Sequence, residues 1–252
     1  MEKMRKFIVI VMILAFFVGI ILFVYPFARG LYLDWRMQDN ASSFLELIRP
    51  TTAPQIPVSS EVPMPEEPEI PNRALWDAVN AYNRQIWVER QADLCDPWAY
   101  QQPSFSLGEF GIEDEIFAVI TIPSIEVEMP IYLGATTDHL SLGAAHLSQT
   151  SLPIGGNNCN CVIAAHRGWH NGKYFYNIVS LKAGDEVIIT NMWEQLTYRV
   201  VKTRAIESYE IDKIKIQEDR DLITLLTCYY TGNNHKMRYA VYCERVIGGE
   251  EV

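Results

Sequence analysis

The stretch LITLLTCYYTGNNHKMRYAVYCERV, residues 222–246, is the part of the chain that decides the expected fold. Two apolar runs rich in β-branched and aromatic residues flank a Gly/Asn turn, which is the pattern of a β-hairpin. Cys228 stands where the first run ends, and Arg238 stands where the second begins. A thiol and a guanidinium at strand ends are placed for nucleophilic chemistry, because the cation can stabilise charge on a substrate.

Similar short runs precede this hairpin, at residues 116–125, 127–134, 160–165, 185–191 and 196–206. Many short strands with little helix between them predict a barrel or a sandwich. We therefore expect a mostly β fold of about seven to eight strands, with one helical turn near residues 174–181.

His166 has the same strand-end position as the cysteine, since it follows the run 160–165 and opens the loop HRGWHNG. Reactive groups at strand ends can converge on one rim of a barrel, where a histidine can act as general acid or base for a thiol. A lone cysteine or histidine is more often structural, so the joint placement with an arginine carries this interpretation. His139 and His146 lie in a polar stretch and are expected to be structural or solvated, and His235 lies in the hairpin turn.

Residues 7–25, FIVIVMILAFFVGIILFVY, form an uncharged run long enough to cross a hydrocarbon core of about 30 Å as a helix. Lys3, Arg5 and Lys6 precede the run, which favours a cytoplasmic N-terminus. The run lacks a small-residue cleavage site, so we interpret it as an uncleaved signal anchor, with a removed signal peptide as the alternative. Both interpretations place the rest of the chain outside the cell, and the first holds it to the membrane by a single pass.

Composition divides the chain further. Residues 50–71 hold seven of the thirteen prolines and four glutamates, which predicts an extended linker. An apolar stripe at helical spacing follows, formed by Leu75, Val79, Tyr82 and Ile86, with Asn72 as a candidate N-cap. The expected segments are 1–30, a cytoplasmic tip and transmembrane anchor; 31–71, a juxtamembrane helix and linker; 72–110, an N-terminal helix and lid segment; and 111–252, a catalytic β-barrel.

The net charge is −10 and no basic patch is present, which argues against a nucleic-acid partner. The five cysteines are Cys95, Cys159, Cys161, Cys228 and Cys243, and an odd number in an exported monomer implies at least one unpaired thiol. The C-x-C pair at 159–161 lacks the two further ligands of a zinc site, so no metal is expected there. A disulfide from this pair to Cys95 or Cys243 and reduced, inert thiols both remain open.

The motif TLLTC at 224–228 resembles the TLxTC signature of sortases, the cysteine transpeptidases of the Gram-positive surface. AAHRG at 164–168 is similar to the segment around the sortase histidine, and RYAVYCERV at 238–246 is similar to the strand that carries the family arginine. The resemblance covers about residues 116–246. It implies a sortase-like closed β-barrel with short helices, preceded by a helical or lid region and one transmembrane helix.

The resemblance also implies roles for individual residues. Cys228 is the expected nucleophile, His166 the general acid and base, and Arg238 the cation that binds substrate or oxyanion. Thr227 is expected to support the cysteine. The family chemistry needs no organic cofactor or catalytic metal; some sortases use calcium, but no acidic cluster in this chain was assigned to it.

Within the family, SLPIGGNN at 151–158 and DPW at 96–98 look most like class C, the pilin-polymerising sortases. Class C members often carry an Asp-Pro-aromatic triplet on a lid, which implies that the lid residues here are Asp96, Pro97 and Trp98. The spacing departs from class C, because Arg238 lies ten residues after the cysteine rather than nine. Met237 occupies the class C distance, so one extra loop residue is inferred, with Arg167 as the fallback cation.

The implied function is a membrane-anchored, extracellular cysteine transpeptidase. It would cleave an LPXTG-like sorting signal between Thr and Gly through a thioacyl enzyme and join the product to an amine, in class C a pilin lysine. One alternative is a sortase of another class that uses a cell-wall peptide as the acceptor. An exported cysteine peptidase, with water as the acceptor, and a non-catalytic surface module are the others.

Overall fold

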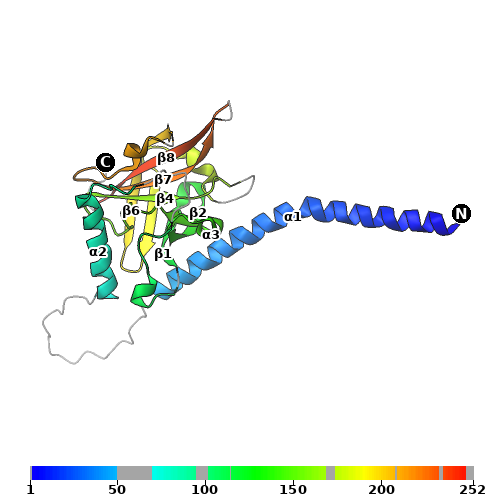
Figure 1. Cartoon of the computed structure of the whole chain (residues 1–252), viewed down its shortest axis with the longest axis horizontal. Helices are drawn as coiled ribbons and strands as arrows, with labels where there is room; N and C mark the ends of the chain where they lie inside the picture. Colours follow the sequence, from blue (N-terminus) through cyan, green and yellow to red (C-terminus); the bar gives the residue numbers. More distant parts are fainter. Residues whose placement is uncertain are drawn as a thin grey trace, which may run out of the picture.

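The computed structural model describes residues 2–49, 70–94, 102–113, 115–168, 174–207, 209–232 and 235–247. In this part of the chain a closed barrel has the strand order β1-β2-β3-β4-β7-β8-β6-β5 (Figure 1). Its strands are β1 Ile116–Ile122, β2 Val127–Leu133, β3 Ala144–His146, β4 Cys159–Ala164, β5 Glu186–Asn191, β6 Gln195–Ile206, β7 Asp221–Tyr230 and β8 Lys236–Arg245. The predicted closed barrel is confirmed, and every predicted run contains a strand.

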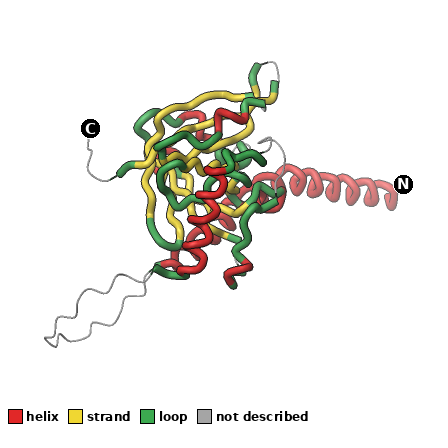
Figure 2. Tube along the Cα trace, turned by 60° about the vertical axis from the view of Figure 1, so that its left-hand side comes forward, coloured by secondary structure: helices red, strands yellow, loops and turns green. Residues whose placement is uncertain are grey.

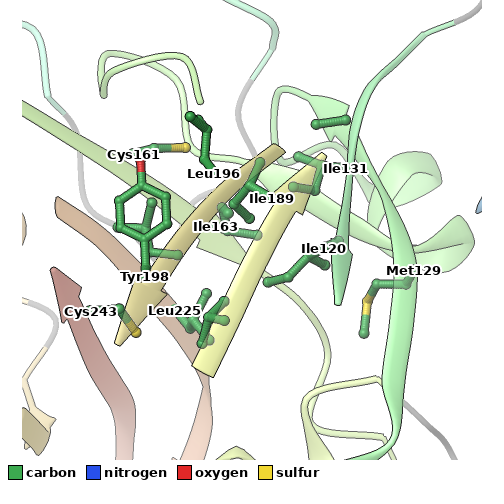
Figure 3. Close-up of a cluster of buried hydrophobic side chains, with 14 of the residues drawn as sticks. Ile120, Met129, Ile131, Cys161, Ile163, Ile189, Leu196, Tyr198, Leu225 and Cys243 are labelled. Atoms are coloured by element: carbon green, nitrogen blue, oxygen red, sulfur yellow. The ribbon is translucent and has the colours of Figure 1, made fainter. Parts of the chain in front are cut away.

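The barrel interior is filled by aliphatic side chains from several strands. Figure 3 shows side chains that include Ile120, Ile163, Ile189, Leu196 and Leu225 gathered in one cluster, and all five are buried. A second buried cluster includes residues of β4, β7 and β8, such as Val162, Leu226 and Ala240. Because the central strands are covered on both faces, they read as continuous apolar runs rather than alternating ones.

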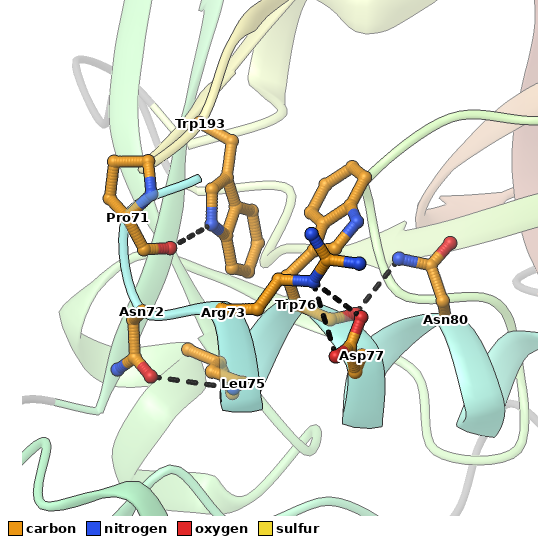
Figure 4. Close-up of polar contacts among 8 residues, drawn as sticks. All are labelled: Pro71, Asn72, Arg73, Leu75, Trp76, Asp77, Asn80 and Trp193. Atoms are coloured by element: carbon orange, nitrogen blue, oxygen red, sulfur yellow. Dashed lines mark hydrogen bonds and ion pairs between the residues drawn. The ribbon is translucent and has the colours of Figure 1, made fainter. Parts of the chain in front are cut away.

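Helix α2, Arg73–Val88, packs on the barrel through its apolar stripe. Asn72 caps its first turn, since its side-chain oxygen accepts a hydrogen bond from the Leu75 amide at 3.3 Å (Figure 4). Asn83 is buried and makes two hydrogen bonds with the Leu152 backbone, at 2.7 and 3.1 Å. The Trp193 indole donates to the Pro71 carbonyl at 2.7 Å. These contacts fix the start of α2 and its angle to the barrel.

Helix α1, Glu2–Ile48, is continuous from the apolar run into the amphipathic piece that follows it (Figure 2). By length and composition it can cross a membrane, and its apolar run is exposed. Its last part buries Met37, Ala41 and Phe44, with Ala41 and Phe44 in a cluster with residues of β1 and β2. The candidate membrane span and the first element that docks on the barrel are therefore one helix.

The remaining described elements are short. They are the helix α3, Thr137–Leu142, and the 3₁₀ turns η1 Gly108–Phe110, η2 Pro123–Ile125, η3 Tyr176–Ser180 and η4 Ile211–Ile214. The turn η3 is the helical turn expected from the sequence. Strand β3 was not predicted, because three residues are too few to show a periodic pattern.

Candidate active site

The hairpin β7–β8 places Cys228 directly opposite Arg238. Directly paired residues of antiparallel strands project from the same face of the sheet, so the two side chains can meet. The Arg238 guanidinium donates from Nη1 to the Cys228 sulfur at 2.6 Å. Met237 pairs instead with Tyr229 and lies one position away, which in a strand is the opposite face.

His166 lies at the same end of the barrel, because β4 runs parallel to β7. The register joins Ala164 to Leu226, and the Ala165 amide donates to the Leu226 carbonyl at 3.1 Å. If this register continues for two more residues, His166 is level with Cys228, because Ala164 is paired with Leu226. Three neighbouring strands, β4, β7 and β8, thus bring the histidine, the cysteine and the arginine to one rim.

Two contacts hold the ends of these strands. The Thr227 hydroxyl donates to the Ala165 carbonyl at 3.0 Å, and the Thr227 side chain is buried. The His166 carbonyl accepts from the Phe175 amide at 3.0 Å. The His166 ring meets the Tyr174 ring edge to face, with 5.9 Å between the ring centroids. Thr227 thus joins the strand that carries Cys228 to the segment that leads to His166, and Tyr174 is a neighbour of His166 that the sequence analysis did not single out.

The protein environment favours the neutral form of His166. Desolvation lowers the pKa of its ring below the usual 6.5, and the positive charge of Arg238 lowers the pKa further. A neutral imidazole at neutral pH can accept a proton from a thiol and later return it. The ring remains accessible to solvent, so a substrate can reach it.

Arg167, the fallback cation, faces tyrosine rings. Its guanidinium carbon lies 5.7 Å from the centre of the Tyr229 ring and 6.0 Å from that of Tyr176. Such cation–π contacts hold the guanidinium next to the site. Of the two arginines considered, Arg238 is the one with a recorded hydrogen bond to the thiol.

The other described thiols are buried. Cys159, Cys161 and Cys243 are free cysteines, so the possible disulfide to Cys243 is not formed. Burial raises the pKa of Cys159 to about 11, and burial also raises the pKa of Cys161 and of Cys243 above the usual range of a thiol. Because the thiolate is the nucleophile, these three thiols are inert, and Cys159 in particular is unsuited to catalysis. Cys95 lies outside the described residues.

Two histidines of the polar stretch are structural. The His139 ring contacts the Gly134 carbonyl and the Glu115 carboxylate, each at 2.8 Å, and the His146 ring contacts the Thr150 carbonyl at 3.0 Å. Both rings are buried, so of the two expected outcomes, structural or solvated, these histidines have the structural one. A polar stretch can be buried when its polar atoms find hydrogen-bond partners within the protein, and the two histidine rings have such partners here.

His235 pairs with Glu207, its Nε2 lying 2.9 Å from a carboxylate oxygen on the protein surface. The lid residues Asp96, Pro97 and Trp98 lie outside the described residues. Within the described ranges, no group of three or more His, Cys, Asp or Glu side chains is arranged to hold a metal ion.

Comparisons with known proteins agree with this geometry. A family model described as Sortase domain matches residues 120–246, half of the chain. Sortase D of Bacillus subtilis (strain 168) is 30% identical over 131 residues, which are 51% of this chain and 63% of that relative, so the match spans less than two thirds of it.

Two solved structures extend the likeness to the fold. Sortase C1 of GBS Pilus Island 1 has a TM-score of 0.66 at 25% identity, covering 86% of this chain and 95% of that chain. Sortase C-1 from Actinomyces oris has a TM-score of 0.60 at 32% identity, covering 70% of this chain and 99% of that chain. The chain belongs to the sortase family of cysteine transpeptidases, and class C sortases are among its structural neighbours.

Proposed function

We propose that this protein is a membrane-anchored transpeptidase in which Cys228 is the nucleophile and His166 the general acid and base. Arg238 binds the substrate carbonyl or the oxyanion, and Thr227 supports the cysteine. The observation that carries the proposal is the 2.6 Å contact between the Arg238 guanidinium and the Cys228 sulfur, with His166 level on the neighbouring strand.

The first half-reaction breaks the peptide bond. Neutral His166 accepts the thiol proton of Cys228, and the sulfur attacks the Thr–Gly carbonyl carbon of the substrate. Arg238 stabilises the oxyanion, for which its fixed donors and permanent charge are suited. The tetrahedral intermediate then expels the glycine amine, which takes the proton from His166, and a thioester to Cys228 remains.

The second half-reaction forms the new bond. An acceptor amine attacks the thioester carbonyl, His166 accepts the proton that the amine loses, and the sulfur leaves. That proton returns the Cys228 thiol to its starting state, so the cycle exchanges one amide bond for another without any redox change. The low pKa of His166 suits this half-reaction, because the ring must be neutral to accept the proton.

The proposed substrate is an LPXTG-like sorting signal, and the proposed acceptor is a lysine of a pilin subunit. A similar structure is named for a pilus island, which supports the pilin as partner. A sortase that uses a cell-wall peptide as the acceptor is the second candidate. A peptidase, with water as the acceptor, is the third.

The proposed location is the Gram-positive cell membrane, with the catalytic domain outside the cell. The long apolar part of α1 supports the anchor. We also propose the division into an anchor (1–30), a juxtamembrane helix and linker (31–71), a helix and lid segment (72–110) and a catalytic barrel (111–252). The lid itself, Asp96, Pro97 and Trp98, remains part of this proposal.

The test is a product analysis with the full chain, an LPXTG peptide and a lysine-containing pilin peptide. Mass spectrometry should detect the joined peptides, and Cys228→Ala should abolish them while Cys159→Ala, which removes a buried thiol, retains them. Cleavage to the free acid alone would show a peptidase. Joining by the Cys228→Ala protein would refute the assignment.

A further inference from the structure

The order of contacts along α1 relates the barrel to the membrane anchor. Asp34 is the first buried side chain of α1, and its charge acts on Tyr174. Further along, the Asn40 amide donates to the Tyr132 hydroxyl at 3.0 Å, and Phe44 then packs at the beginning of β1. The part of α1 that docks first after the apolar run therefore lies beside Tyr174, and the later turns move away from it.

Tyr174 connects that first contact with the catalytic rim. Its ring meets the His166 ring at 5.9 Å, and its hydroxyl donates to the Ser141 carbonyl at 2.7 Å. Burial raises the pKa of Tyr174, the Asp34 charge raises it further, and the Arg29 charge lowers it. Tyr174 thus has His166 on one side and α1 residues 29–34 within electrostatic range on the other.

The rise per residue of an α-helix gives the distance of each α1 residue from the end of the apolar run. At 1.5 Å per residue, Arg29 and Asp34 lie about 6 Å and about 14 Å beyond Tyr25, where the apolar run ends. Both charges act on the pKa of Tyr174, which is consistent with its position beside this part of α1. The headgroup layer itself is about 5–8 Å thick on each side.

The opposite face of the same helical turns is apolar and uncovered. Leu31, Tyr32 and Trp35 are 68%, 56% and 59% exposed, and exposed Arg36 follows them. Tyr and Trp are enriched where a helix passes through lipid headgroups, and arginine pairs with their phosphates. This face continues the apolar run without a break, so its occupant is the same bilayer.

We propose that the catalytic rim of the barrel faces the membrane, held in that orientation by residues 29–36 of α1, which lie at the lipid headgroups. This rests on the proposed membrane anchoring and adds the orientation of the site. The start of β4 and helix α2 face away from the bilayer; Figure 1 shows α1 leaving the barrel on the side opposite α2. Pro26 removes one hydrogen bond within α1, so a bend of the helix is easiest at that point.

The test measures two heights in one protein. The full chain with Cys95→Ser is placed in vesicles of equimolar phosphatidylcholine and phosphatidylglycerol that carry a headgroup acceptor dye. A donor dye is attached either to Cys228 or, in a Cys228→Ala background, to Asn157→Cys, an exposed position just before β4. The seven residue-to-residue steps from Cys159 to His166 span about 23 Å in an extended chain, so the two dyes are at clearly different heights if the rim faces the membrane. We expect stronger energy transfer from Cys228 than from position 157.

An insertion of two helical turns after Phe27 provides the matched variant, since it keeps the helix face and lifts the barrel by about 11 Å. It should reduce the transfer from Cys228. Equal transfer from both positions, or an insertion without effect, would overturn the proposed orientation while the anchoring stands. Failure of the labelled protein to bind the vesicles would overturn the anchoring and the orientation together.

Discussion

The hydrogen bond between Thr227 and the Ala165 carbonyl joins two strand ends next to the candidate catalytic residues. It is 3.0 Å long, and the Thr227 side chain is 1% exposed. Thr227→Val keeps the shape of the side chain and removes only the donor. The bond lies between the backbone that carries Cys228 and the backbone that carries His166, so its loss should affect both stability and the geometry of the site.

The expected magnitudes follow from burial. A buried carbonyl that loses its donor costs about 1–3 kcal/mol of unfolding free energy. In a domain of this size that is a fall in Tm of about 2–4 °C for each kcal/mol. Misplacing a catalytic group by an ångström can cost about 100-fold in rate, so kcat/KM should fall by roughly 10- to 100-fold.

Thr224→Val is the matched control. The Thr224 hydroxyl donates to the Asn160 side-chain oxygen at 2.9 Å, across the same pair of strands, and Thr224 is 0% exposed. It lies four residues before the cysteine, so its replacement should lower Tm to a similar degree and leave kcat/KM close to wild type.

Both variants are compared by thermal unfolding and by peptide-joining kinetics, at a temperature where both are folded. A loss of kcat/KM in Thr227→Val alone supports the reasoning. Equal losses in the two variants would show that the effect is general destabilisation, and full activity of Thr227→Val would show that this bond does not position the site.

Three further outcomes are expected. Arg238→Lys should lose most joining activity, because a point charge cannot replace the paired donors of the guanidinium, whereas Arg167→Ala should be milder; the reverse result would exchange their roles. Arg238→Gln should raise the pKa of His166, followed by NMR of the ring, since a cation that disfavours the imidazolium is removed; an unchanged pKa would contradict this. Asp96→Ala combined with Trp98→Ala should speed alkylation of the active-site thiol if the lid closes over it, and an unchanged rate would remove the lid.

The strands, and the meeting of Cys228 and His166 at one rim, could be predicted because their signals are local. Cys228 and His166 each end an apolar run, and strand ends gather at the rims of a barrel. The partner of the cysteine was harder to assign, because a period of two makes Arg238 and Met237 point to opposite faces. The register of β7 against β8 determines which of the two residues lies opposite Cys228, and the length of the turn sets this register.

Other features depend on tertiary contacts that leave no pattern in the chain. Tyr174 is held by α3, an element far from it in sequence, because its hydroxyl donates to the Ser141 carbonyl. His139 and His146 look solvated in a polar stretch, but their rings are buried on carbonyl and carboxylate partners. The continuity of α1 through Pro26 was also not evident, because a proline and nearby charges are typical of a helix end.

The central claim is that Cys228 is the nucleophile, and trapping the acyl enzyme tests it most directly. The full-length protein is mixed with an LPXTG peptide, quenched in acid and digested, and the modified cysteine is located by mass spectrometry. We predict a thioester to the threonine carbonyl on Cys228, with none on Cys159, Cys161 or Cys243, whose thiols are buried. An adduct on one of those thiols, or on Cys95, with Cys228 unmodified would contradict the account.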